Sequence, residues 1–160
     1  MTPAGPLTPD RAERLLALNN ADAATLSMLD AAGLAGLLHQ AFWTARVGDV
    51  DGFAVLLDQG AAYDSPNHAW FRQRYERFAY VDRIVVAADR RGQGIARRLY
   101  SAALDAAAGA GHTMLAAEVT SDPPNPASDA FHAAFGFTEV GRATIHGGTK
   151  AVRYLVRAVP

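Results

Sequence analysis

The sequence contains no cysteine in its 160 residues. Disulfide bonds, thiolate metal sites and a cysteine nucleophile are therefore excluded. The chain also has no uninterrupted apolar run of about 18 residues, and its first residues lack the basic start and apolar stretch of a signal peptide. We expect a cytoplasmic protein without a membrane partner.

Neither sign of charge dominates, because 15 Lys and Arg face 16 Asp and Glu and the formal net charge is -1. Such a balance does not predict a broad basic surface for nucleic acid. Half of the residues are hydrophobic, which is enough for the core of a single domain. Because three prolines and a glycine fall within residues 1–9, we expect a flexible tail there and one domain over residues 10–160.

Apolar periodicity and turn residues predict an alternation of strands and helices. Strands are expected over residues 13–17, 42–47, 53–57, 78–87, 113–119, 137–145 and 151–159. Helices are expected over residues 22–41 (one or two), 95–110 and 125–135, the last capped by Asn125 and opened by Pro126. The central strand–helix–strand unit implies a parallel pair, and the hairpins imply antiparallel pairs elsewhere. The predicted class is therefore α/β (α+β), with a mixed, mostly antiparallel sheet and flanking helices.

Residues 59–77 carry several aromatic side chains but no clear period. Two alternatives stay open for this segment. It is either a surface segment that its aromatic residues fix to the body of the protein, or a wall over a substrate pocket. The aromatic residues are Tyr63, Trp70, Phe71 and Tyr75.

A glycine turn, Arg91-Gly92-Gln93-Gly94-Ile95-Ala96, joins the strongest predicted strand to a helix. The first amides of a helix have no internal acceptor and carry the positive end of the helix dipole, and glycine lets a ligand approach the backbone. The turn therefore predicts a site for phosphate or pyrophosphate. A P-loop and a Rossmann fingerprint are disfavoured, because the Lys-Ser/Thr pair and the third glycine are missing. Positive charge comes from Arg90, Arg91, Arg97 and Arg98.

The same turn resembles the Gln/Arg-x-x-Gly-x-Gly/Ala signature of the GCN5-related N-acetyltransferases, and Glu118, Asn125 and the run Phe131 to Phe137 resemble the later part of that pattern. The resemblance implies acetyl-CoA as co-substrate and no metal. It implies that the main chain of residues 91–96 holds the pyrophosphate, and that residues 84–87 pair with the pantetheine arm where the sheet is splayed, commonly at a bulge. The implied cofactor-binding residues are Ile84, Val85, Val86, Arg91, Gly92, Gln93, Gly94, Ile95, Ala96, Arg97, Asn125 and Ser128.

Acetylation of an amine needs a base, because a protonated amine does not attack a thioester. Glu118 is the first candidate, since apolar neighbours raise the pKa of a carboxyl group. Asp82 is the second, with an ion pair to Arg83 as the alternative role. The resemblance places the acid at His132, where the family usually has tyrosine, and Ser128 lies one turn earlier and could orient the imidazole.

Because there is no cysteine, we expect direct attack in a ternary complex rather than an acylated enzyme. The expected acceptor is a primary amine of a small molecule or peptide. The alternative function is a non-catalytic acyl-CoA-binding module with a regulatory role. The composition allows a homodimer without requiring one.

Overall fold

The computed structural model describes residues 2–3, 9–21 and 26–160. The described helices are α1 (Pro9–Ala21), α2 (Ala31–Gln40), α3 (Pro66–Arg72), α4 (Ile95–Gly109) and α5 (Pro126–Ala134). The described strands are β1 (Thr2–Pro3), β2 (Trp43–Val47), β3 (Gly52–Asp58), β4 (Ala79–Val86), β5 (Met114–Asp122), β6 (Thr138–Ile145) and β7 (Lys150–Ala158). A short 3-10 helix over Ala88–Arg90 precedes the glycine turn.

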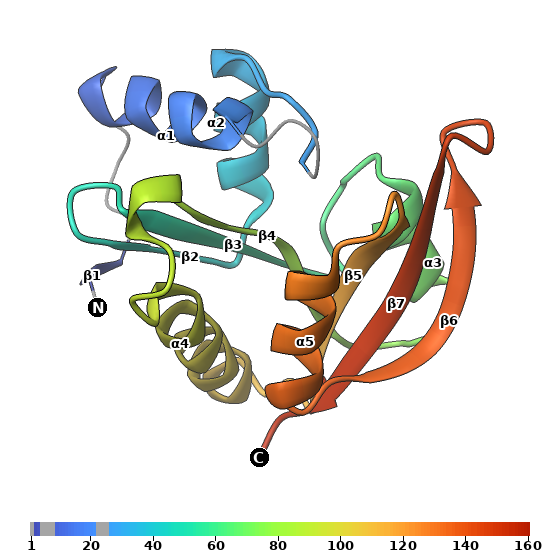
Figure 1. Cartoon of the computed structure of the whole chain (residues 1–160). Coiled ribbons are helices and arrows are strands. Elements are labelled where there is room, and N and C mark those ends of the chain that lie inside the picture. Colours follow the sequence, from blue (N-terminus) through green and yellow to red (C-terminus); the bar gives the residue numbers. More distant parts are fainter. Residues whose placement is uncertain (1, 4–8, 22–25) are drawn as a thin grey trace.

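The strands form one sheet in the order β1-β2-β3-β4-β5-β7-β6, in which β4 and β5 are parallel and every other neighbouring pair is antiparallel. The parallel pair is short, because it includes only Ala79 with Leu115 and Tyr80 with Ala116. Beyond these residues β4 and β5 diverge, so that β1–β4 and β5–β7 form two wings of the sheet (Figure 1). The predicted mixed sheet with a splayed parallel pair is confirmed.

A bulge in β4 lies at the point where the two wings separate. Val55 of β3 pairs with Arg83, whereas the next residue, Leu56, pairs with Val81. Asp82 is therefore an extra residue on β4 without a partner on β3. Because a bulge bends its strand and increases the local twist, it directs β4 away from β5 beyond Tyr80.

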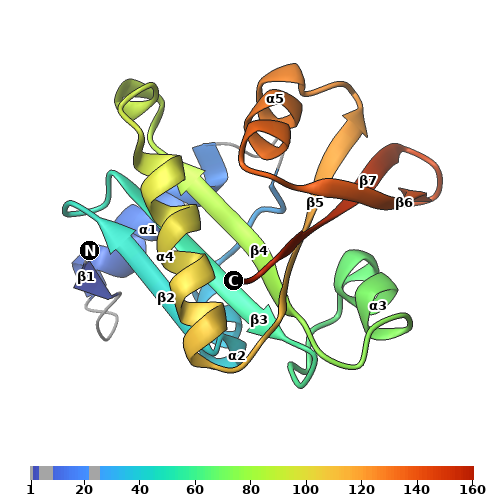
Figure 2. The same cartoon turned by 90° about the horizontal axis from the view of Figure 1, so that it is seen from below.

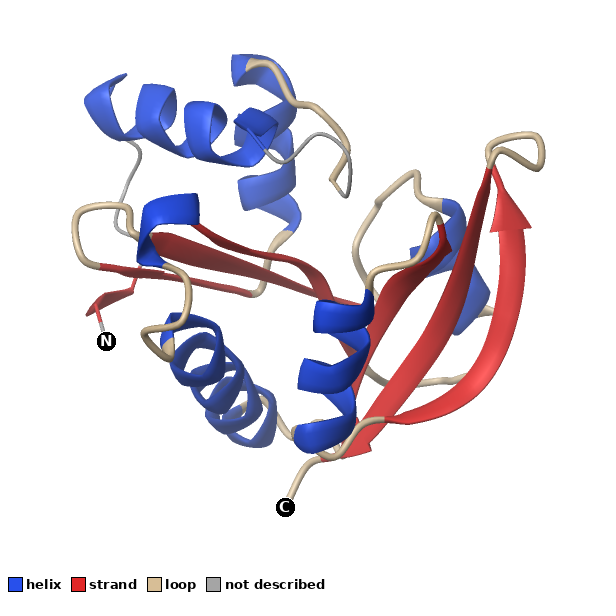
Figure 3. Ribbon diagram, viewed as in Figure 1, coloured by secondary structure: helices blue, strands red, loops and turns tan. Residues whose placement is uncertain are grey.

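Helices cover both faces of the sheet (Figures 1, 2 and 3). On one face, Leu15 of α1, Leu34 of α2 and Phe71 of α3 pack against buried residues of β3, β4, β5 and β7. On the other face, Tyr100 of α4 and Phe135, which directly follows α5, belong to a second buried cluster with residues of β3, β4, β5 and β7. The sheet thus separates an α1–α3 side from an α4–α5 side.

Two expectations near the N-terminus are wrong. Residues 13–17 belong to helix α1, in which Leu15 and Asn19, four residues apart, are both buried and share one helix face. Helix α2 begins only at Ala31, because the side chain of Asp30 accepts a hydrogen bond from the amide of Gly33 at 2.7 Å and caps the helix. Residues 26–30 are not helical, and residues 22–25 lie outside the described residues.

The predicted tail over residues 1–9 lies mostly outside the described residues. Its described part comprises Thr2 and Pro3, which pair with Arg46 and Ala45 of β2, and Pro9, which opens α1. The hairpins, the strands β4 and β5 and the helices α4 and α5 lie where the sequence pattern predicts them.

The aromatic segment over residues 59–77 is fixed to the body of the protein by its side chains. Phe71 is fully buried, and the Trp70 ring stacks on Tyr154 of β7 with 4.2 Å between the ring centroids. None of the four aromatic residues lines the main cleft described below. The aromatic side chains thus pack as the first alternative expects, while the Tyr63 hydroxyl also lies 3.5 Å from Nη2 of Arg83, a residue that lines the cleft.

We predict that Gly141→Ala destabilises the fold, because a Cβ at Gly141 of β6 would lie 2.3 Å from Cζ2 of Trp70. The indole cannot move aside easily, since it is held between Tyr154 and the guanidinium of Arg74. The free energy of unfolding, measured by urea denaturation, should fall by about 1–3 kcal/mol. Gly36→Ala is the control: its Cβ would meet nothing within 4 Å in α2, so it should be neutral or stabilising. Equal effects of the two variants would contradict the steric explanation.

Candidate active site

A cleft of about 710 Å³ opens where β4 and β5 separate. It is lined by β4, the glycine turn, the start of α4, the end of β5 and α5. The predicted site residues that line it are Asp82, Ile84, Val86, Arg91, Gly92, Gly94, Ile95, Ala96, Arg97, Glu118, Asn125, Ser128 and His132. Val85 and Gln93 do not line it: the Val85 side chain is buried on the opposite face of β4, as strand alternation requires, and Gln93 is exposed in the turn.

The glycine turn has the conformation of an anion-binding site. Gly92 and Gly94 adopt φ values of 75° and 77°, in the left-handed region that residues with a Cβ rarely occupy. A Cβ at either position would meet nothing within 4 Å, so the space in front of the backbone is open. Gly94 caps α4 without any side-chain hydrogen bond, and the first intrahelical bond runs from the amide of Arg98 to Gly94.

The amides of residues 95–97 therefore have no acceptor within the helix. Ile95 and Ala96 face the cleft, together with the side chains of Arg90, Arg91 and Arg97. Unpaired amides, a helix dipole and several cations at one end of the cleft suit a pyrophosphate. The residues present thus fit the phosphate-bearing end of coenzyme A.

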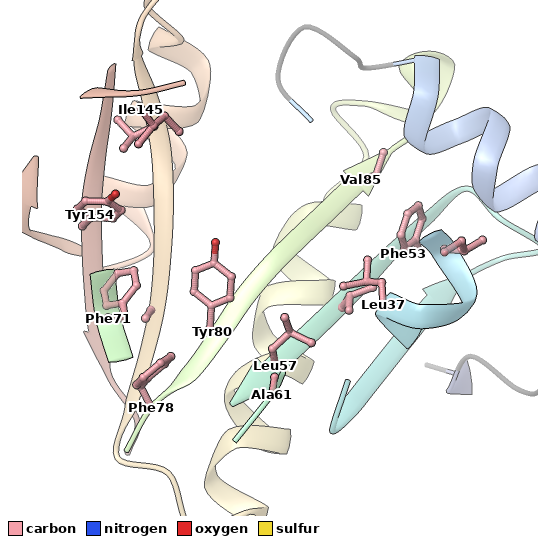
Figure 4. Close-up of a cluster of buried hydrophobic side chains, with 14 of the residues drawn as sticks. Leu37, Phe53, Leu57, Ala61, Phe71, Phe78, Tyr80, Val85, Ile145 and Tyr154 are labelled. Carbon is pink, nitrogen blue, oxygen red and sulfur yellow. The ribbon is translucent and has the colours of Figure 1, made fainter. Parts of the chain in front are cut away.

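Glu118 of β5 lies where the two wings separate and is only partly accessible. Its Oε2 accepts a hydrogen bond from the hydroxyl of Tyr80 at 2.6 Å. Tyr80 stands on β4 between the buried side chains of β3 and those of β7 (Figure 4). Burial raises the pKa of Glu118 to about 7, although the hydrogen bond from Tyr80 and the charge of Lys150 act in the opposite direction. Glu118 is therefore a carboxyl group that can gain and lose a proton near neutral pH.

Asp82, the second candidate base, forms an ion pair with Arg83, with 2.7 Å between Oδ2 and Nε and both side chains only 3% exposed. The guanidinium of Arg83 also donates to Oδ1 of Asn19 in α1 at 2.7 Å. The carboxylate is thus compensated, and the pair ties the bulge of β4 to α1. This arrangement favours the ion-pair alternative and a structural role for Asp82.

His132 of α5 is buried beside the cleft and has partners at both ring nitrogens. Nδ1 lies 2.7 Å from the carbonyl oxygen of Ser128, and because a carbonyl only accepts, Nδ1 carries the hydrogen. Nε2 then accepts the hydroxyl hydrogen of Tyr100, whose oxygen lies at 2.6 Å. Burial lowers the pKa of His132, so the imidazole is neutral at neutral pH. Tyr100 and His132 both line the cleft, so this hydrogen-bonded pair is available to a ligand there.

Sequence reasoning missed Tyr80, Tyr100 and Lys150 at this site. A partial signal existed for Tyr100, because it lies on the apolar face of α4 and a buried tyrosine hydroxyl needs a hydrogen-bond partner. Tyr80 carried the same signal within the strongest predicted strand. Lys150 gave no signal, because it directly follows a turn, where lysine is unremarkable.

In the part of the chain that the structure describes, no group of three or more His, Asp or Glu side chains could hold a metal ion. None of the described helices is both long enough and apolar enough to cross a membrane.

The fold and the cleft define a class of α/β proteins in which two diverging strands and a glycine turn form a ligand-binding cleft. Residues 30–137 match the model of the Acetyltransferase (GNAT) family, and the chain belongs to this family. It is accordingly an acetyl-CoA-dependent acyltransferase. No curated protein matches the chain in a sequence search.

Solved structures share the fold at low sequence identity. A chain of the NatC complex bound to Gag peptide and CoA has a TM-score of 0.74 at 17% identity, with 99% of this chain and 97% of that chain covered. Ard1 from Thermoplasma volcanium has a TM-score of 0.72 at 16% identity, with 96% and 95% covered. The ribosomal-protein-alanine N-acetyltransferase from Brucella melitensis has a TM-score of 0.67 at 23% identity, with 95% and 96% covered. At these identities the likeness shows the fold alone.

We predict that Tyr80→Phe raises the pKa of Glu118 by about 1 unit, because the lost hydroxyl stabilises the ionised carboxylate. A carbon-13 NMR titration of the glutamate carboxyl groups measures this directly and needs no substrate. Tyr154→Phe is the control, since its hydroxyl donates to Asn67 at 2.9 Å instead. An unchanged Glu118 pKa in Tyr80→Phe would refute the assigned hydrogen bond.

Proposed function

We propose that the chain transfers an acetyl group from acetyl-CoA to a primary amine of a small molecule or peptide, by direct attack in a ternary complex. The observation that carries this proposal is Glu118, a carboxyl group with a pKa of about 7 where β4 and β5 diverge, in the same cleft as the glycine turn. We further propose a cytoplasmic location and one acetyltransferase domain over residues 10–160.

The glycine turn and β4 would hold the co-substrate. The amides of residues 91–96 bind the pyrophosphate, and the guanidinium groups of Arg91 and Arg97 lie beside it. The main chain of residues 84–87, on the side of β4 that β5 has left, pairs with the pantetheine arm. Val85 would take part only through its main chain, since its side chain is in the core.

Asn125 contributes to the site while it caps α5. Its Oδ1 accepts from the amide of Ser128 at 3.3 Å, and both residues line the cleft. We assign Asn125 and Ser128 to the pantetheine side of the cleft, where they would contact the arm or orient the residues that do.

Glu118 would act as the base. An amine with a reference pKa of about 8 to 10 is mostly protonated at pH 7, so it must lose a proton before it attacks. A carboxylate with a pKa near the working pH combines a useful ionised fraction with adequate basicity. Asp82 is less suited to this role, because its charge is already compensated by Arg83.

The shared proton of Tyr100 and His132 would go to the leaving sulfur. As the N–C bond forms and the C–S bond breaks, the acceptor nitrogen loses two protons. Glu118 takes one and later releases it to solvent. The second proton from the acceptor nitrogen returns to the Tyr100–His132 pair, which has given its own proton to the thiolate. His132 thus keeps the role implied by its position, with the tyrosine hydroxyl supplied by Tyr100 on α4.

We predict that Gly94→Glu lowers the affinity for acetyl-CoA at least about 100-fold, because it adds bulk and negative charge at the pyrophosphate site. Isothermal titration calorimetry measures the affinity. Gly147→Glu is a matched control: Gly147 has a similar left-handed φ of 65° and open surroundings, but lies in the loop between β6 and β7. If Gly94→Glu and the wild type bind acetyl-CoA with equal affinity, the pyrophosphate does not bind at this turn.

We predict that Glu118→Gln lowers kcat/KM about 10²- to 10⁴-fold without changing the affinity for acetyl-CoA. In the wild type, activity should rise as the pH increases through about 7, because Glu118 acts only when it is ionised. The variant should lose this rise. The measurement is thiol release with a panel of amines between pH 5 and 9. Acetyl-CoA binding without thiol release by the wild type would instead favour the non-catalytic module.

A further inference from the structure

Residues from both faces of the sheet line the cleft, which therefore has two differently built sides. On the α4–α5 side it is lined by the glycine turn, the arginines and His132, which suit coenzyme A. On the α1–α3 side it is lined by Leu26, Glu118, Thr120 and Lys150, together with the Asp82–Arg83 pair. Because coenzyme A would occupy the first side, the acceptor approaches Glu118 from the second.

The acidic groups on the acceptor side are already engaged. Asp82 and Glu118 are the acidic residues among those that line the described cleft. Asp82 is paired with Arg83, and Glu118 accepts from Tyr80 and is needed as the base. Among these cleft residues, no carboxylate is left over to bind a second positive charge on the acceptor. A polycationic acceptor would therefore find no partner there for its additional ammonium groups.

Lys150 is the second basic residue on this side of the cleft, besides Arg83. It is the only lysine in the sequence, because the other basic residues counted with it are arginines. It begins β7 and is half-buried, on the same face of the strand as the buried Val152 and Tyr154. No described Asp or Glu forms an ion pair with it. Its ammonium group is nevertheless close enough to Glu118 to lower the pKa of that residue.

We propose that the acceptor is a free α-amino acid whose carboxylate binds the ammonium group of Lys150 while its amino group lies at Glu118. This inference rests on the proposed acetyl transfer to an amine. An α-amino acid carries an amine and a carboxylate on one carbon, which matches one base and one cation without an ion pair at the same end of the cleft. A lysine ammonium is a compact point charge that a carboxylate can approach from several directions.

The test measures binding to the full chain saturated with CoA, so that it does not depend on turnover. The probes are L-alanine, L-methionine, L-phenylalanine and L-glutamate, each compared with its α-carboxamide by isothermal titration calorimetry. At least one acid should bind at least about tenfold more tightly than its amide. Lys150→Met should abolish this difference and Lys150→Arg should keep most of it. Arg142→Met, which removes a positive charge from the neighbouring strand outside the cleft, should change nothing.

Binding of amides as tight as that of acids, or failure of every acid to bind, overturns the inference. An equal weakening of acids and amides by Lys150→Met overturns it as well. Glutamate α-carboxamide keeps the side-chain carboxylate, which a peptide can also offer, but lacks the free α-carboxylate. Tighter binding of this amide than of glutamate would therefore also count against the inference. If the acids bind but are not acetylated, the proposed recognition by Lys150 is supported and the proposed function is refuted. If the amides are acetylated at the same rate as the acids, the proposed function is supported and the recognition by Lys150 is refuted.

Discussion

The extra residue in β4 is the constraint on which the site depends. With Asp82 unmatched on β3, β4 turns away from β5 after a single short stretch of parallel pairing. A regular β4 would continue the ladder, and its edge would then be satisfied by β5 rather than open to a ligand. The bulge is fixed because the side chain of Asp82 is compensated by Arg83, which also bonds to Asn19 of α1. A buried ion pair on the first wing thus keeps the cleft open.

The local features of the site could be predicted from the sequence, whereas the contacts between residues far apart in the chain could not. The glycine turn is recognisable because the need for left-handed φ values and open backbone is a property of adjacent residues. The hydrogen bond between Tyr80 and Glu118 joins residues 38 positions apart, and that between Tyr100 and His132 joins residues 32 apart. In both pairs, the residues next to each partner in the sequence do not indicate that the long-range hydrogen bond will form. The sequence therefore identified Glu118 and His132 as candidates but not the tyrosines that hydrogen-bond to them.

The error at α1 has the same origin. Adjacent leucines at 15 and 16 are compatible with a short strand as well as with a helix, because periodicity decides little over five residues. Contacts with residues outside this segment stabilise the helical conformation. Leu15 packs into the core formed with the sheet, and Asn19 bonds to an arginine 64 residues away. Tertiary contacts thus decide an element whose local signal is ambiguous.

The distribution of charge differs between the two ends of the cleft. At the glycine turn, cations and unpaired amides accumulate, which an anionic ligand can neutralise. At the opposite side, the structure compensates Arg83 internally and keeps Glu118 close to its midpoint of ionisation at neutral pH. A carboxylate held this way costs little to protonate or to ionise, so it can exchange a proton with a bound amine. Burial raises the pKa of Glu118 and the hydrogen bond from Tyr80 opposes that shift, so the packing of the splayed sheet determines how readily this carboxyl group exchanges a proton.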